Sequence, residues 1–289
     1  MSTITGHTGL TALLGSPVAH SISPLMHNEA FRLLELDYVY LCFDVNEETL
    51  PAAVAGLRTC GIRGFNLTMP NKNKIVELLD ELSPEAQLIG AVNTVLNDNG
   101  KLIGYNTDGY GFMQSVRDAG HDVTNKNITV MGVGGASMAI CAQSALDGAS
   151  SVHIFARRTS RYWNRTQKFA ENLTAKTGCQ VCLFDNDDHT ALKDSIAQSY
   201  LLINASVGMV PDIDDTIIKD TSLFRPGLVV ADVVYEPQET RLLREAKAAG
   251  CQTFNGMYML LHQGAKAFKI WTGQDMPVSI IKEKYFSVK

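Results

Sequence analysis

Ile128-Thr-Val-Met-Gly-Val-Gly-Gly-Ala-Ser137 decides the fold, because a short apolar run leads there into a glycine-rich turn and then into a helical pattern. A strand, a glycine turn and a helix in this order are the context in which such a motif binds a dinucleotide. Gly132 allows a tight turn, while Gly134 and Gly135 let the backbone approach a pyrophosphate at the helix N-terminus, where free N–H groups attract anions. The competing interpretation is a plain glycine-rich connection between a strand and a helix.

Apolar runs of strand length alternate with helical patterns after this turn. Further strands are expected at residues 152–155, 181–184, 201–205 and 228–231, and helices at residues 136–147, 162–177 and 240–250. The last two strand patterns are continuously apolar, as are parallel strands buried on both faces. Residues 110–256 are therefore predicted to form a Rossmann dinucleotide-binding domain, an α/β fold on a parallel sheet.

The first third of the chain shows the same alternation. Strands are expected at residues 10–15, 38–43 and 64–67, and helices at residues 23–34, 47–60, 72–79 and 84–89, with Ser23 as the cap of the first helix and Pro24 at its first position. Asn97-Asp-Asn-Gly100 lies between two short strand patterns and is a strong hairpin signal. Residues 1–109 are predicted to form a second α/β domain on a mostly parallel sheet, and residues 256–289 to be helical.

The expected second strand of the Rossmann domain ends in Phe155-Ala-Arg-Arg-Thr-Ser-Arg161, roughly 20 residues beyond the glycine turn, where such folds bind the ribose. No acidic residue is present there to bind a 2′-hydroxyl. Three arginines are present instead, and a guanidinium fork suits a 2′-phosphate. The pattern favours NADP over NAD, although the arginines can also be solvated surface and Thr159 can serve a hydroxyl.

A second pair of motifs carries groups that can move a proton. Gly64-Phe-Asn-Leu-Thr-Met-Pro-Asn-Lys72 places a lysine after a proline turn, and Asn106-Thr-Asp108 places an aspartate after another short apolar run. A lysine beside a carboxylate can exchange a proton with a carbon-bound oxygen. Together with a dinucleotide site, the pair indicates hydride transfer between a nicotinamide and an alcohol or ketone.

Lys72, Asp108 and three other polar residues that could bind a ligand also have ordinary structural interpretations. Lys72 can be solvated, Asp108 can cap a helix, Ser21 and Ser23 can cap the helix at Pro24, and Asn93 can hold a turn.

Composition excludes several other classes of protein. The chain has 289 residues, of which 45% are hydrophobic and 19% charged, and a net charge of −5, which argues against nucleic acid as a partner. No apolar run reaches the roughly 18 residues of a membrane helix, and the start of the sequence lacks a signal-peptide pattern, so a cytoplasmic location is expected. Cys179-Gln-Val-Cys182 has no second half at zinc spacing, and no metal site is predicted.

Taken together, the motifs resemble the shikimate dehydrogenase family, and within it most closely the quinate/shikimate dehydrogenase branch. The resemblance runs nearly end to end. It covers Gly15-Ser-Pro-Val-Ala-His-Ser-Ile-Ser-Pro24, Asn66-Leu-Thr-Met-Pro-Asn-Lys72, Gly90-Ala-Val-Asn-Thr-Val95, Asn106-Thr-Asp-Gly109, Gly132 to Ala136, Asn204-Ala-Ser-Val-Gly-Met209, Asp232-Val-Val-Tyr235 and Gln263-Gly-Ala265.

The resemblance implies a role for each matching residue. Lys72 would be the catalytic lysine and Asp108 its partner, acting on shikimate, 3-dehydroshikimate or quinate. The hydroxyls and carboxylate of this small-molecule substrate would be bound by Ser21, Ser23, Thr68, Asn93 and Gln263, and Tyr235 would line the same cleft. The dinucleotide, NADP or NAD, would be held by Gly132, Val133, Gly134, Gly135, Ala136, Ala156, Arg157, Arg158, Thr159, Val233 and Gly256. The family's C-terminal helices, here residues 257–289, would return to the first domain.

Several positions depart from the branch. Ala156 replaces a common Asn, Thr159 stands where Asp is frequent, His262 replaces a frequent Trp and Tyr258 replaces a Gly. The first two concern cofactor preference and the last two substrate fit. Two other functions stay open from sequence, namely a methylene-tetrahydrofolate dehydrogenase-like enzyme and a non-enzymatic dinucleotide-binding regulator. A homodimer also stays open.

Overall fold

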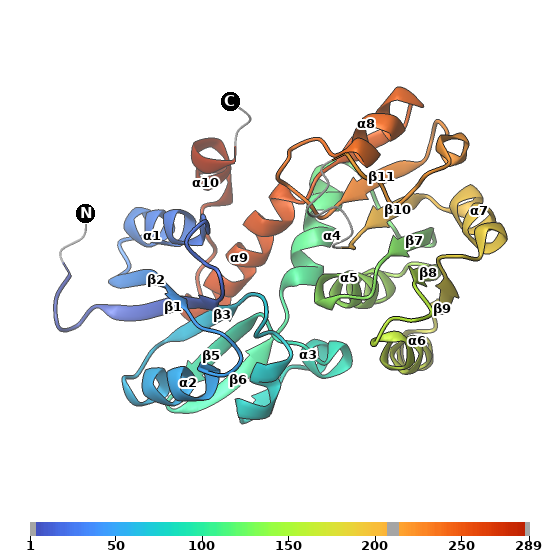
Figure 1. Ribbon diagram of the computed structural model, residues 1–289. Coiled ribbons are helices and arrows are strands. Elements are labelled where there is room, and N and C mark those ends of the chain that lie inside the picture. The colour runs from blue at the N-terminus through green and yellow to red at the C-terminus, as the bar shows by residue number, and fades with distance from the viewer. Residues whose placement is uncertain (1–3, 207–213, 287–289) are drawn as a thin grey trace. The chain divides into compact units, whose positions relative to one another are not determined.

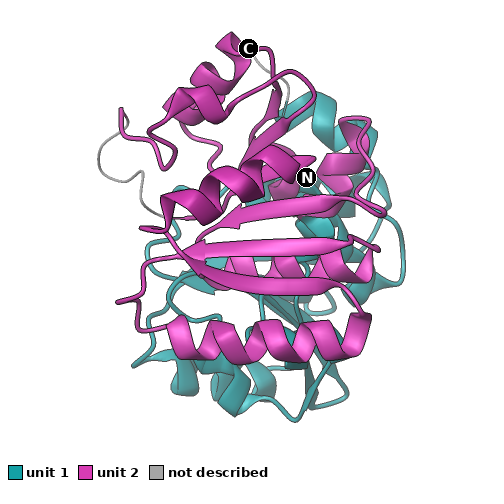
Figure 2. Cartoon of the chain, turned by 90° about the vertical axis from the view of Figure 1, so that its right-hand side faces the viewer, with its two compact units in different colours: residues 1–111, 261–289 teal, residues 112–260 magenta. Residues whose placement is uncertain are grey.

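The computed structural model describes residues 4–206 and 214–286, and its elements are labelled in Figure 1. The chain divides into two compact units, coloured in Figure 2. Unit 1 consists of residues 1–111 and 261–289, and unit 2 of residues 112–260. Val207, Gly208 and Met209 of the family-like motif, and the last three residues of the expected helical tail, lie outside the described residues.

Unit 2 contains a six-stranded parallel sheet in the order β12-β11-β10-β7-β8-β9. The strands are β7 (Asn127–Met131), β8 (Ser151–Ala156), β9 (Gln180–Asp185), β10 (Leu201–Asn204), β11 (Val229–Asp232) and β12 (Gln252–Phe254). The order reverses between β7 and β10, which is the switch point where Rossmann sheets bind ligands. The glycine turn follows β7, directly at this point.

The helices of unit 2 connect these strands and pack against the sheet. They are α5 (Gly135–Leu146), α6 (Trp163–Thr177), α7 (His189–Gln198) and α8 (Arg241–Ala248), with a short 3-10 turn η2 (Thr221–Leu223). Parallel connections are right-handed, so the reversal at the switch point puts α5 and α6 on one face and α7 on the other. The core packed against α7 and α8 includes Phe155, Leu202 and Val230, which are buried.

Unit 1 contains a mixed six-stranded sheet in the order β2-β1-β3-β5-β6-β4. Its strands are β1 (Gly9–Gly15), β2 (Tyr38–Asp44), β3 (Gly64–Leu67), β4 (Glu81–Leu82), β5 (Thr94–Asp98) and β6 (Lys101–Tyr105). β1 pairs in parallel with β2 and β3, while β5 pairs antiparallel with β3 and β6. The hairpin turn has positive φ at Asn99 and Gly100, as a two-residue turn between twisted strands requires.

The helices of unit 1 include two from the end of the chain. They are α1 (Ser23–Leu33), α2 (Leu50–Thr59), the 3-10 helix η1 (Lys74–Leu78), α3 (Pro84–Ile89), α4 (Asp108–Asp118), α9 (Met257–Thr272) and α10 (Val278–Tyr285); the chain crosses between the units within α4 and α9. Trp271 of α9 is fully buried and donates its indole N–H to the Val95 carbonyl at 2.9 Å. The indole packs directly on Gly64, where even a Cβ atom would overlap it, so glycine is required at this position.

The α/β fold class with two sheets is confirmed, and the structure adds details that local patterns missed. Ser23 does not cap α1, because the cap is Ile22, which makes no side-chain capping bond, and Ser23 is already the first, buried residue of the helix. The elements α7, β4 and β12 were not predicted, since α7 is polar on most of its surface and the two strands are only two and three residues long. In the described part of the chain, no helix is both long and apolar enough to cross a bilayer.

Candidate active site

Lys72 and Asp108 lie together in unit 1. Lys72 stands in the turn between β3 and η1, and Asp108 is the first residue of α4. The Lys72 ammonium Nζ lies 2.6 Å from Oδ2 of Asp108, although 36 positions separate the two residues. The Lys72 side chain is 23% exposed and the Asp108 side chain only 6%. The Asp108 carboxylate is therefore almost enclosed by the protein, while part of the Lys72 side chain reaches the surface.

Asn93 and Thr107 fix the orientation of this carboxylate. Asn93 Nδ2 donates to the second oxygen of Asp108, Oδ1, at 2.8 Å, so each carboxylate oxygen has its own donor. The backbone N–H of Thr107 donates to Asn93 Oδ1 at 2.8 Å. Because only the amide oxygen can accept from a backbone N–H, this bond fixes which end of the Asn93 amide faces Asp108.

Other predicted substrate residues lie in the same unit. Gln263 of α9 reaches Asn93 through its Oε1, at 3.5 Å from Asn93 Nδ2. Ser21 accepts a hydrogen bond from the backbone N–H of Ser23 at 3.2 Å, in the turn that precedes α1. Thr68 directly follows β3, and its methyl group lies against Gly15, where a Cβ would overlap it. Tyr235 belongs to unit 2.

The glycine turn of unit 2 leaves open space where a dinucleotide backbone would lie. Gly132 has a φ of 111°, and a Cβ there would meet the Ala205 carbonyl, so glycine is required. Ser137 donates to the Gly132 carbonyl at 2.5 Å and ties α5 to the turn. A Cβ at Gly134 or Gly135 would meet no atom within 4 Å. These two residues form a bare surface at the helix N-terminus that fits a pyrophosphate.

The arginines after β8 are exposed, but two of them are already held by aromatic rings. The Arg158 guanidinium lies 4.8 Å from the centre of the Trp163 ring, and that of Arg161 lies 4.7 Å from the Tyr162 ring. Ala156 is buried at the end of the strand, and Arg157 and Thr159 are exposed beside it. An exposed, positively charged strand end at this position fits a ribose phosphate.

Val233 and Gly256 meet at the far side of the sheet's carboxyl edge. A Cβ at Gly256 would overlap the Val233 carbonyl, so glycine is required for this approach. Below them Asp232 is fully buried and accepts hydrogen bonds from Asn204, Thr240 and the Val234 backbone N–H. Burial raises the pKa of the Asp232 carboxyl, and these donors oppose the rise. The bonds hold the ends of β10 and β11 in a fixed arrangement.

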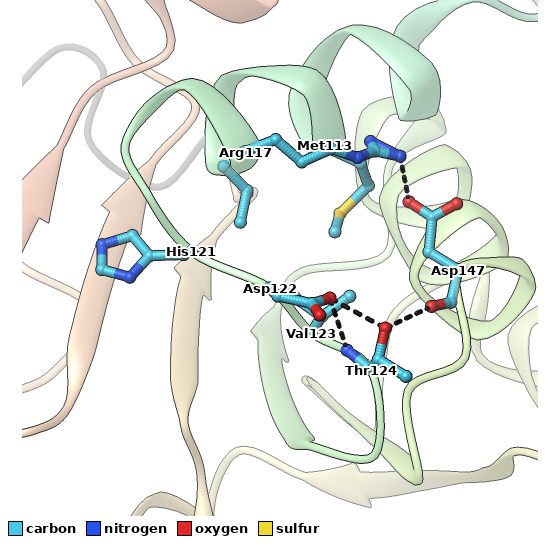
Figure 3. Close-up of a pocket in the computed structure, with 8 residues that line it drawn as sticks. Met113, Arg117, His121, Asp122, Val123, Thr124 and Asp147 are labelled. Carbon is cyan, nitrogen blue, oxygen red and sulfur yellow. Dashed lines mark hydrogen bonds and ion pairs between the residues drawn. The ribbon is translucent and has the colours of Figure 1, made fainter.

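Unit 2 also has a pocket of about 170 Å³ that is separate from the predicted site residues (Figure 3). Its lining residues His121 to Thr124 precede the start of β7, whereas the glycine turn follows the end of that strand. Arg117 and Asp147 on its wall pair with each other at 2.8 Å. The pocket contains none of the predicted site residues. Among residues 4–206 and 214–286, no group of three or more His, Cys, Asp or Glu is placed to hold a metal ion.

Three buried polar residues near the Lys72 pair were not singled out from sequence. They are Tyr40, Asn66 and Thr94, whose side chains bond to one another or to Asn93. Asn66 stood within a quoted motif, and a lone amide in the otherwise apolar strand Gly64–Leu67 was the available signal. Nothing in the sequence pointed to a role for Tyr40 in the site, because its place in the strand β2 is that of an ordinary sheet residue.

A Rossmann sheet with an open glycine turn, joined in one chain to a buried carboxylate that holds a lysine, defines the class of dinucleotide-dependent dehydrogenases. Comparison with known proteins narrows this class. Residues 13–95 match the shikimate dehydrogenase substrate binding domain family, and residues 256–284 match the shikimate 5'-dehydrogenase C-terminal domain family. Shikimate dehydrogenase (NADP(+)) from Listeria innocua is 51% identical over 98% of this chain and 97% of its own length.

Solved structures agree with this assignment. Shikimate 5-dehydrogenase from Listeria monocytogenes, crystallised with shikimate and NAD, matches with a TM-score of 0.93 at 50% identity over 98% of both chains. Quinate dehydrogenase from Corynebacterium glutamicum, in complex with NAD, matches with a TM-score of 0.85 at 29% identity, over 97% of this chain and 99% of that one. The chain belongs to the shikimate dehydrogenase family.

Proposed function

We propose that this chain interconverts shikimate and 3-dehydroshikimate with NADP or NAD, and that Lys72 and Asp108 handle the proton. The observation that carries the proposal is the 2.6 Å contact between the Lys72 ammonium and an Asp108 carboxylate that Asn93 holds from its other side. The identity to shikimate dehydrogenases over the full chain supports the substrate class. It favours this reaction over a folate-linked dehydrogenase and over a regulator without activity.

A dinucleotide held by the glycine turn would supply or accept the hydride. During ketone reduction, the Lys72 ammonium donates a proton to the substrate oxygen as negative charge develops there, and during alcohol oxidation the free amine accepts it. The Asp108 carboxylate accepts a hydrogen bond from the substrate hydroxyl and keeps Lys72 in place. Because its Oδ1 is already occupied by Asn93, Oδ2 is the oxygen that orients both Lys72 and substrate.

The remaining polar residues of unit 1 are proposed to bind the rest of the substrate. The hydroxyls and the carboxylate would be bound by Ser21, Ser23, Thr68, Asn93 and Gln263. Tyr235 of unit 2 is proposed as a further contact. In unit 2 the glycine turn with Val133 and Ala136, the stretch Ala156 to Thr159, and the pair Val233 and Gly256 are proposed to bind the cofactor.

Replacing Gly134 by alanine is expected to weaken NADP binding without changing the stability of the protein. Gly134 has φ −76° and ψ 177°, an extended conformation open to any residue, and a Cβ there meets nothing within 4 Å. Glycine is then needed only for the close approach of a ligand, so the added methyl group should raise the Kd for NADP by about tenfold or more. Fluorescence titration with NADP and thermal unfolding measure the two quantities.

Gly56→Ala is the matched control, because Gly56 of α2 in unit 1 is equally open to an added Cβ. Its NADP affinity should equal that of the wild type. Unchanged NADP affinity in Gly134→Ala would show that the glycine turn is not part of the cofactor site.

Activity measurements test the proposed function directly. The purified protein is mixed with shikimate or quinate and with NADP or NAD, and reduced nicotinamide is followed by absorbance. Turnover of shikimate with a preference for NADP is expected, because exposed positive charge rather than an acidic residue follows β8. Absence of turnover with both substrates would contradict the proposal, and faster turnover of quinate would reassign the substrate. A cytoplasmic location and a homodimer stay predictions.

A further inference from the structure

A continuous series of hydrogen bonds runs through the interior of unit 1 and ends on the proposed catalytic carboxylate. Tyr40 donates to Asn66 Oδ1 at 2.9 Å, and Asn66 Nδ2 donates to Thr94 Oγ1 at 3.0 Å. Thr94 donates to Asn93 Oδ1 at 3.0 Å, and Asn93 Nδ2 donates to Asp108 Oδ1 at 2.8 Å. All five residues are at most 5% exposed. We call this series the Tyr40–Asp108 chain.

The direction of donation along the chain is fixed by backbone groups. Asn66 Nδ2 also donates to the Asn93 carbonyl at 3.1 Å, and the Thr107 backbone N–H donates to Asn93 Oδ1. Each amide is thereby fixed with its oxygen facing away from Asp108 along the chain. Asn66 Oδ1 must accept, so the Tyr40 phenol must donate. Every donor thus points toward Asp108, and hydrogen bonds aligned in one direction polarise and strengthen one another.

Packing holds the Tyr40 ring in place. Burial raises the pKa of the Tyr40 phenol, and the side chain of Ser23, a proposed substrate residue, opposes the rise. The ring itself is fully buried and stacks on His27, with the ring centres 4.4 Å apart and the planes inclined by 7°. Tyr40 therefore has one position, and it cannot swing out to contact substrate itself.

We propose that Tyr40 is a positioning residue, which orients Asp108 through Asn66, Thr94 and Asn93. The inference rests on the proposed function. Removing the phenol leaves Asn66 Oδ1 buried without a donor, so the Asn66 amide is free to rotate and Asn93 loses a fixed neighbour. Small misplacements of a proton-handling group reduce turnover strongly, even when substrate still binds.

Tyr40→Phe removes only the phenolic oxygen and tests this. We expect kcat for shikimate oxidation to fall about tenfold while the KM for NADP stays within about twofold, because the glycine turn lies in the other unit. Tyr38→Phe is the matched control, since Tyr38 lies two residues away on the same strand and no hydrogen bond of its phenol occurs within the described residues. That variant should retain the kcat of the wild type.

Thr94→Val interrupts the Tyr40–Asp108 chain at another hydrogen bond. It separates a loss of Asp108 positioning from a general loosening of unit 1. If Tyr40 acts through Thr94, the kcat of the double variant Tyr40→Phe/Thr94→Val should lie within about twofold of that of the slower single variant. If the losses in kcat of the two single variants multiply in the double variant, the proposal is overturned. A kcat of Tyr40→Phe within about twofold of the wild-type value would overturn it as well. If Tyr40→Phe does not fold, a normal kcat in Thr94→Val overturns it. Inactivity of the wild type contradicts the proposed function instead.

Discussion

Replacing Lys72 by alanine is expected to lower the turnover of shikimate by a factor on the order of 10²–10⁴, the usual effect of removing a positioned acid–base group. The ammonium is the only group in contact with Asp108 Oδ2 that can deliver a proton, among the contacts found in the described residues. Asp108 keeps its bond to Asn93, so the carboxylate should stay in place. Affinity for NADP should change little, because no proposed cofactor residue lies in unit 1. Steady-state kinetics with titrated NADP measure both values.

Lys74→Ala provides the matched control for this experiment. Lys74 lies two residues further on, at the start of η1, and pairs with Glu77 at 2.7 Å on an exposed surface. The same change of residue there removes a charge without touching the proposed site, so turnover should be normal. Near-normal turnover in Lys72→Ala would show that another group handles the proton.

Local patterns were sufficient for most of the fold. The strand, turn and helix from Asn127 to Leu146 formed as predicted because Gly132 alone can adopt its positive φ beside Ala205. The hairpin at Asn97 to Gly100 formed because its turn residues adopt positive φ without side-chain strain. In both places a few adjacent residues determine the conformation, so no knowledge of distant contacts was needed.

The interior of the site could not be derived in this way. Lys72 and Asp108 meet because β3 pairs with β5 and β5 with β6, and strand order in a sheet is a long-range property. Their motifs suggested a pair, but only the pairing register brings Asn93 beside both. The capping role given to Ser23 was wrong, because α1 begins at Ser23 itself and Ile22 is its cap. The assigned roles of these residues stay predictions.

Protonation of His27 should make the protein less stable in mild acid. The imidazole is fully buried, neither ring nitrogen has a hydrogen-bond partner, and its neighbours are the rings of Tyr40, Phe268 and Trp271. Burial lowers the pKa of His27 from 6.5 to about 3, since nothing compensates a charge there. The unfolded chain therefore binds this proton more readily than the folded one.

The sign follows from that difference. The stabilising contribution of neutral His27 is complete above the unfolded value of 6.5 and is lost as the pH falls toward about 3. The free energy of unfolding should drop by about 1.4 kcal/mol per pH unit within this window, or about 2–3 kcal/mol between pH 6.5 and 4.5. His27→Phe keeps a ring against Tyr40 but cannot take a proton, so it should remove this part of the pH dependence.

Urea unfolding of the wild type and of His27→Phe, at several pH values from 4.5 to 7.5, measures the effect. His121 and His153 also have pKa values lowered by burial, but both residues are present in both proteins and cancel in the difference. His7→Phe is the control, because its ring is exposed. Parallel stability curves for the wild type and His27→Phe would mean that the folded protein admits a proton or water to His27, and that its aromatic surroundings are less closed than the contacts indicate.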